Sequence, residues 1–145
     1  MKKILIINGP NLNLLGKRED HIYGKETLDE IETKCKEKAS EKNLDMDFYQ
    51  TNDEGKMIDK MHEVEKAYDG VIINPAAFTH SSIAILDCLR SISKPKIEIH
   101  LSNIYAREDF RKKSITSEGV HGLICGFGAN SYTLGIEAIS KLIYS

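Results

Sequence analysis

The chain has 145 residues, a formal net charge of −2 and an isoelectric point of about 6.2. A chain of this length fits one domain, and its charge balance provides no global basic field to recruit nucleic acid or an anionic membrane. The three cysteines are far apart and form no CxxC pair, which favours buried thiols in a reducing compartment over a disulfide framework or a zinc site. The first apolar run is too short for a signal peptide and no later segment is long enough to span a membrane, so we expect a cytoplasmic protein.

Short apolar runs recur along the chain and predict strands. The first, ILIIN at residues 4–8, is continuously apolar, as expected of a strand covered on both faces. Four more strand candidates lie at residues 45–51, 70–75, 95–101 and 121–128.

Helical patterns separate these runs. A capping box at Thr27 and Glu30 opens an amphipathic stretch that reaches about Asn43. A second helix is expected around residues 57–65, a third begins near Thr79, and the last covers residues 130–143.

Five strands that alternate with four helices predict a doubly wound parallel α/β sheet with helices on both faces. We expect the flavodoxin-like strand order 2-1-3-4-5. The sequence contains no repeat, low-complexity tract or linker, so residues 1–145 are expected to form a single catalytic domain.

Polar side chains gather where the predicted strands end. In open α/β sheets the ligand binds beyond the carboxyl ends of the strands, so these loops share one edge of the sheet. The polar residues at this edge are Asn8, Asn11, Asn13, Asn52, Asn74, His80, His100, Ser102 and Asn103. A single loop asparagine is usually a turn-former, but the convergence of the group predicts a binding site.

The segment IEIHLSNIYAREDFR, residues 97–111, carries the most informative pattern. In an extended chain Glu98, His100 and Ser102 point away from the apolar side of the strand, and Arg107 and Arg111 follow. Arginines bind carboxylates bidentately and a histidine can move a proton, so the pattern indicates acid–base chemistry on a small anionic molecule that carries hydroxyl groups.

Other chemistries fit the sequence less well. It lacks the GxGxxG and GxxxxGK[ST] phosphate-binding motifs after the first strand. Its five histidines show no metal-ligand spacing, so no metal is expected. A Schiff-base enzyme needs a lysine in the site, and of the lysines near this edge only Lys17 could reach it.

Four long motifs resemble the type II 3-dehydroquinate dehydratases of the shikimate pathway. They are NGPNLNLLGKRE, YGKETLDEI, NPAAFTHSSIAILD and EIHLSNIYAREDFR, in this order and spacing over nearly the whole chain. The resemblance implies a flavodoxin-like fold and a homo-dodecamer built from four trimers. It further implies dehydration of 3-dehydroquinate by anti elimination through an enolate, with neither metal, imine nor other cofactor.

The resemblance also implies catalytic roles by position. Tyr23 resembles the catalytic base, Arg18 the residue that activates it, and His100 the general acid that protonates the leaving hydroxyl. Asn11 would position a water or an oxygen near the enolate, and Glu98 would orient His100.

Further positions resemble substrate contacts of the family. These are Asn74, His80, Leu101, Ser102 and Arg111. Arg107 would support Tyr23 and the charge balance, and Asp87 matches an aspartate that a neighbouring subunit supplies. The chain departs from common family residues at Ala76, at Phe78 and at Asp20-His21, none of which removes a catalytic group.

Two other classes of function stay open at this point. The chain could be a non-catalytic, oligomeric flavodoxin-like binding module, or a flavodoxin-like electron carrier, which would be coloured when purified. Some of these residues could also have a purely structural role. Glu98 and His100 could be a hydrogen-bonded pair in the core, and Asp87 a partly exposed residue of a helix face.

Overall fold

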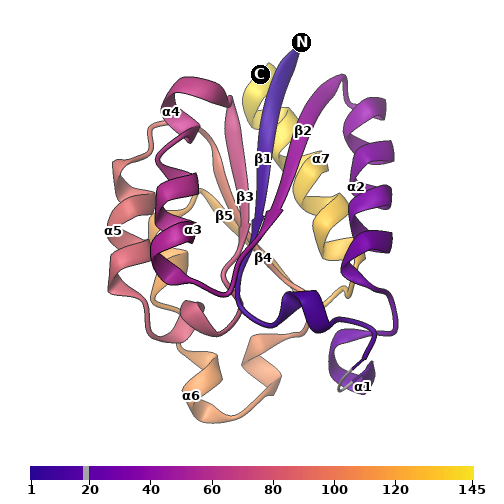
Figure 1. Cartoon of the computed structure of the whole chain (residues 1–145), viewed down its shortest axis with the longest axis vertical. Coiled ribbons are helices and arrows are strands. Elements are labelled where there is room, and N and C mark those ends of the chain that lie inside the picture. Colours follow the sequence, from indigo (N-terminus) through magenta and orange to yellow (C-terminus); the bar gives the residue numbers. More distant parts are fainter. Residues whose placement is uncertain (18–19) are drawn as a thin grey trace.

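The computed structural model describes residues 1–17 and 20–145 of the chain. It contains one parallel five-stranded sheet with the order β2-β1-β3-β4-β5, which confirms the predicted flavodoxin-like topology. The strands are β1 (Lys2–Asn8), β2 (Leu44–Gln50), β3 (Gly70–Asn74), β4 (Lys96–His100) and β5 (Gly122–Cys125). Figure 1 shows the sheet between two layers of helices.

Helices cover both faces of the sheet. The long helices α2 (Leu28–Glu41) and α7 (Asn130–Tyr144) pack together on one face. The other face carries α3 (Glu54–Met61), α4 (Val64–Ala67) and α5 (Ile83–Ser91). Two further short helices, α1 (Asp20–Tyr23) and α6 (Asp109–Lys112), lie beyond the carboxyl ends of the strands, at the bottom of Figure 1.

The alternation of side chains along the central strands divides the core into two clusters. On β1, Ile4 and Ile6 face α2 and α7, whereas Leu5 and Ile7 face the other helical layer. All four side chains are fully buried, as expected of a strand covered on both faces. The same alternation along β4 determines where its polar side chains point.

Two helix predictions were wrong in their boundaries. The helix expected near residues 57–65 is interrupted at His62 and Glu63, where a tight turn separates α3 from α4. The helix expected from about Thr79 begins at Ile83, because the Ser82 hydroxyl accepts the Ile85 N–H and caps it there. The residues before it, Ala76–His80, form a 3-10 turn after β3.

The cysteines of the described residues are unpaired thiols. Burial raises the pKa of Cys35, on α2, to about 12. A thiol of this kind stays protonated near neutrality and acts as a small apolar core residue. Within the described residues, no helix is both long enough and apolar enough to cross a membrane.

The predicted capping box is present at the start of α2. The Thr27 hydroxyl accepts the Glu30 N–H at 3.2 Å, and the Glu30 carboxylate accepts the Thr27 N–H at 3.4 Å. Two backbone N–H groups that the helix itself cannot satisfy thus gain partners.

We therefore expect Thr27→Ala to lower the free energy of unfolding by about 1 kcal/mol, the usual value of an N-cap side chain. Urea unfolding followed by circular dichroism measures the loss. Thr33→Ala is the matched control on the same helix: the Thr33 hydroxyl only donates back to the Asp29 carbonyl, so the change should stay within about 0.5 kcal/mol. Equal losses in the two variants would contradict a capping role for Thr27.

Candidate active site

A cavity opens where the strands end, at the edge of the sheet that the sequence predicted. In register, Asn8 on β1 pairs with both Gln50 on β2 and Asn74 on β3, so three strands end side by side. The cavity walls come from the loops after β1, β3 and β4, from α1 and from α6. Its lining residues are Pro10, Asn11, Leu15, Tyr23, Asn74, Ala76, Ala77, His80, His100, Leu101, Ser102, Ile104, Arg107 and Arg111.

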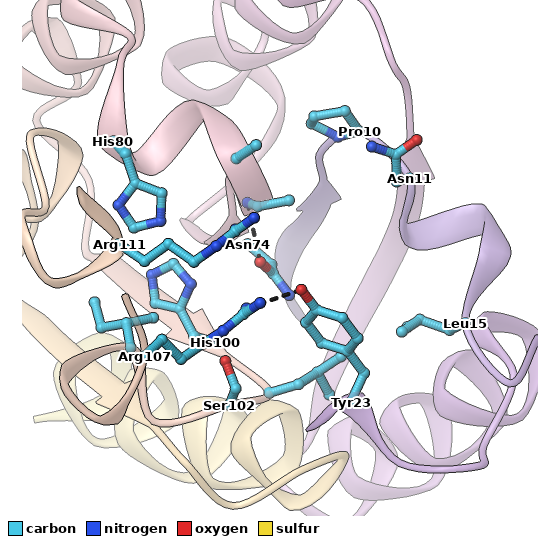
Figure 2. Close-up of a pocket in the computed structure, with 14 residues that line it drawn as sticks. Pro10, Asn11, Leu15, Tyr23, Asn74, His80, His100, Ser102, Arg107 and Arg111 are labelled. Atoms are coloured by element: carbon cyan, nitrogen blue, oxygen red, sulfur yellow. Dashed lines mark hydrogen bonds between the residues drawn. The ribbon is translucent and has the colours of Figure 1, made fainter. Parts of the chain in front are cut away.

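Most of the predicted site residues line this one cavity. They are Asn11, Tyr23, Asn74, His80, His100, Leu101, Ser102, Arg107 and Arg111. Figure 2 shows His80, His100 and Arg111 on one side of the cavity, with Asn11, Leu15 and Tyr23 on the other. Two arginines and two histidines therefore face a space for which the described residues supply no lining carboxylate.

Glu98 lies behind His100 rather than in the cavity. Because Ile97 and Ile99 pack toward α2 and α7, Glu98 points to the opposite face of the sheet, where its side chain is fully buried. The ring Nε2 of His100 lies 2.7 Å from Oε2 of Glu98. A carboxylate only accepts hydrogen bonds, so Nε2 carries a proton and Nδ1 is the ring nitrogen left to exchange a proton with a ligand.

Two hydroxyl groups complete the surroundings of Glu98. Thr116, itself fully buried, donates to Oε1 at 2.6 Å, and Ser114 donates to Oε2 at 3.3 Å. The sequence prediction missed both residues. The available signal was the hydroxyl-rich run Ser114-Ile115-Thr116-Ser117, but its distance from Glu98 along the chain gave no reason to pair them.

Tyr23 lies at the end of α1, with its hydroxyl directed toward a guanidinium. The Nη1 of Arg107 donates to the Tyr23 hydroxyl at 2.8 Å, drawn as a dashed line in Figure 2, and its guanidinium carbon lies 5.1 Å from the centre of the ring. A cation that donates to a phenol oxygen stabilises negative charge on that oxygen. Arg18, the other predicted partner of Tyr23, lies outside the described residues.

His80 and Arg111 form the polar wall near α6. The Nδ1 of His80 donates to the Lys113 carbonyl at 2.7 Å, which turns Nε2 into the nitrogen available to a ligand. Glu108 forms an ion pair with Arg111 at 2.9 Å. The pKa of the Glu108 carboxyl lies below its ordinary value, first because its own backbone N–H donates to it and then because Arg111 and Arg107 are close.

The remaining residues of the predicted edge have structural contacts. Asn8 is fully buried below the cavity and bonds to Tyr49 and to Tyr132, a residue that the sequence prediction missed. Asn52 accepts the backbone N–H of Asn11, and Asn103 accepts the N–H of Tyr105. Asp87 is exposed on α5 and does not line the cavity, so its role at a neighbouring subunit's site stays a prediction.

No group of three or more His, Cys, Asp or Glu side chains within residues 1–17 and 20–145 is arranged to hold a metal ion. What the cavity offers is a phenol and an imidazole on different walls, with arginines and amides between them. Such groups can remove one proton, donate another and bind an anionic molecule through its oxygen atoms.

Ala76 holds an unusual backbone conformation in the cavity wall. Its φ is 52°, in the left-handed region, which costs a residue with a Cβ atom about 1–2 kcal/mol. Glycine takes this conformation without that strain but loses about 0.5–1 kcal/mol more entropy on folding than alanine.

Ala76→Gly should therefore stabilise the fold by about 0.5–1 kcal/mol, measured by urea unfolding. Ala77→Gly is the control. Ala77 has no positive φ, so this variant relieves no strain and should lower the stability of the fold. A loss of stability in Ala76→Gly would show that the strain at this position is smaller than the entropy difference.

Comparisons with known proteins bear on the same stretch of chain. A family model described as "Dehydroquinase class II" matches residues 2–140. The chain is 57% identical over 139 residues to a 3-dehydroquinate dehydratase of Clostridium botulinum (strain Hall), which covers 96% of this chain and 95% of that protein.

Solved structures give the same picture. The type II dehydroquinase of Butyrivibrio crossotus superposes with a TM-score of 0.93 at 45% identity, covering 95% of this chain and 97% of that one. The type II dehydroquinase of Propionibacterium acnes superposes with a TM-score of 0.94 at 42% identity, covering 97% of each chain.

Proposed function

The chain belongs to the class II dehydroquinase family, and we propose that it converts 3-dehydroquinate to 3-dehydroshikimate and water. It is thus a hydro-lyase with residues 1–145 as a single catalytic domain, and its reaction belongs to the shikimate pathway. The observation that carries the proposed mechanism is the pairing of each reactive group with a charged partner. The Tyr23 hydroxyl accepts from Arg107, and the His100 ring donates to Glu98.

Tyr23 is the base in the proposed mechanism. The proton beside a ketone is weakly acidic, and a phenolate is a suitable base for it when a cation stabilises the ionised form. Arg107 supplies such a cation at 2.8 Å from the phenol oxygen. Arg18, from the resemblance alone, is proposed to assist it.

Removal of the proton leaves an enolate, whose negative charge needs a nearby donor. Asn11 lines the cavity and would donate to the enolate oxygen directly or through water. Collapse of the enolate then expels the hydroxyl group, and His100 protonates it as it leaves, with Glu98 stabilising the charged ring. Tyr23 ends protonated and His100 neutral, so one proton must pass back between them through solvent before the next cycle.

The substrate is an anion with several hydroxyl groups, and the lining side chains suit each part. Arg111 is a cation for a carboxylate or hydroxyl oxygen, and Asn74, His80 and Ser102 supply donors and acceptors for hydroxyl groups. The backbone at Leu101 contributes to the same wall. The direct test of the function is the absorbance of the conjugated enone product after addition of 3-dehydroquinate to the purified chain.

Separate variants distinguish the two proton transfers. Tyr23→Phe should abolish dehydration and also the exchange of solvent deuterium into recovered 3-dehydroquinate, because no enolate forms. His100→Ala should reduce dehydration by ~10²–10⁴-fold, the usual value of a general acid, with a much smaller effect on exchange. Mass spectrometry of recovered substrate measures the exchange. Loss of exchange in His100→Ala together with normal exchange in Tyr23→Phe would reverse the assignment.

We also propose that the chain forms a homo-dodecamer of four trimers in which Asp87 reaches a neighbouring subunit's cavity. Asp87 is exposed on α5, and Ile83, one turn before it on the same face, is 64% exposed. A large apolar side chain beside an unshielded carboxylate suits a face that another subunit covers. A cytoplasmic location is part of the same proposal, and the free cysteines fit a reducing compartment.

Mixing two inactive variants tests the role of Asp87. Asp87→Ala and His100→Ala should each be poorly active. Subunits that are unfolded together and refolded at equal amounts should regain about a quarter of the wild-type activity, because half the intact cavities then meet an intact neighbour. Light scattering should report a multiple of the 16.3 kDa chain. A fully active monomer, or a mixture no more active than its parts, would contradict the role across subunits.

A further inference from the structure

Three buried polar side chains meet beneath the cavity, although they come from distant parts of the sequence. Asn8 ends β1, Asn74 ends β3 beside it, and Tyr132 lies in the first turns of α7. Their exposed fractions are 0%, 2% and 0%. Of the three, only Asn74 lines the cavity. Burial of this much polar surface is favourable only when the donors and acceptors are matched.

The hydrogen bonds of this group leave one arrangement of donors and acceptors. The side-chain nitrogen of Asn8 donates to the Tyr49 carbonyl at 3.1 Å, so the side-chain oxygen of Asn8 faces Tyr132. An amide oxygen can only accept, and the Tyr132 hydroxyl therefore donates its one proton to Asn8, at 2.6 Å.

The same reasoning fixes Asn74. Because the proton of the Tyr132 hydroxyl is committed to Asn8, its oxygen can only accept, and it does so from the side-chain nitrogen of Asn74 at 3.0 Å. The side-chain oxygen of Asn74 is turned the other way and accepts the Ala76 N–H at 3.2 Å. Both ends of the Asn74 amide therefore have a hydrogen-bonding partner within the protein.

From this arrangement we infer that Tyr132 is a positioning residue for substrate binding, acting through Asn74. An amide nitrogen has two hydrogens, and Tyr132 accepts one of them, so Asn74 presents its second N–H to the cavity. The site then offers a donor at this point, which selects an oxygen acceptor of the substrate and disfavours a donor group there. The inference rests on the proposed function, because it assigns a part of that same binding site.

The experiment is Tyr132→Phe, which removes the hydroxyl and keeps the ring in the core. The Asn74 amide then loses the partner that fixes its orientation, and a rotated amide would present an acceptor to the substrate oxygen. We expect KM for 3-dehydroquinate to rise about tenfold while kcat stays within about threefold. The reason is that a rotated Asn74 amide no longer donates a hydrogen bond to the substrate.

A matched control separates this effect from a general loss of stability. Tyr68 is another buried tyrosine whose hydroxyl donates to a side chain, here Asp47 at 2.6 Å, and it lies outside the cavity lining. Tyr68→Phe should lower the stability of the fold but leave KM unchanged. A similar rise of KM in both variants would mean that loss of a buried hydroxyl acts nonspecifically.

A double variant tests whether the effect passes through Asn74. In the Asn74→Ala background, Tyr132→Phe should cause no further rise in KM. If Tyr132→Phe does not fold, Asn8→Ala is the test of the inference. This variant removes the acceptor of the Tyr132 hydroxyl proton, so the hydroxyl can donate elsewhere and Asn74 can rotate while the tyrosine remains. It should raise KM to a similar extent.

The possible failures are distinct. The inference is overturned if KM is unchanged in folded Tyr132→Phe, or in Asn8→Ala when Tyr132→Phe does not fold. It is also overturned if Tyr132→Phe raises KM as much in the Asn74→Ala background as in the wild-type chain. Absence of dehydratase activity in the wild-type chain would instead contradict the proposed function.

Discussion

The full burial of the Glu98 carboxylate is the constraint on which the site depends. A buried negative charge is very costly unless several donors surround it. Here the donors are three side chains: His100 on the same strand, and Ser114 and Thr116 in the connection to β5. The requirement to satisfy Glu98 therefore fixes the His100 ring and also the path of the chain behind it.

Two side chains on different walls of the cavity, His100 and Tyr23, each have a charged partner. Glu98 supports the His100 ring, and Arg107 supports the Tyr23 phenol. Each of the two groups proposed to transfer a proton thus has a hydrogen-bonding partner of the charge that its proposed role requires. The proposed elimination needs a base in its first step and an acid in its second, and partners of opposite charge suit the two side chains to these opposite roles.

The sequence predicted the parts of the structure that follow from local pattern. The strands, the capping box of α2 and the polar face of β4 were all visible in short segments, because side-chain alternation and capping act over a few residues. The boundaries of α5 were missed because the Ser82 cap competed with an apolar pattern that begins earlier. Thr116 and Tyr132 were missed for another reason: their partners are distant in sequence and become neighbours only when the sheet forms. Asp87 shows the corresponding limit for a single chain, since its proposed partner belongs to another subunit.

The two histidines of the cavity show why residue type alone could not assign the roles. Each ring donates one N–H to a fixed acceptor and turns its other nitrogen to the ligand side, but the acceptors differ. The Lys113 carbonyl beside His80 carries no net charge, whereas the Glu98 carboxylate beside His100 does. A hydrogen bond to a carboxylate is stronger than one to a carbonyl, so the His100 ring, 2.7 Å from Glu98, is the one placed for the proposed proton transfer, and His80 for a neutral hydrogen bond to the substrate. This difference between the two histidines comes from β4, where apolar and polar residues alternate and place the buried Glu98 side chain next to the His100 ring.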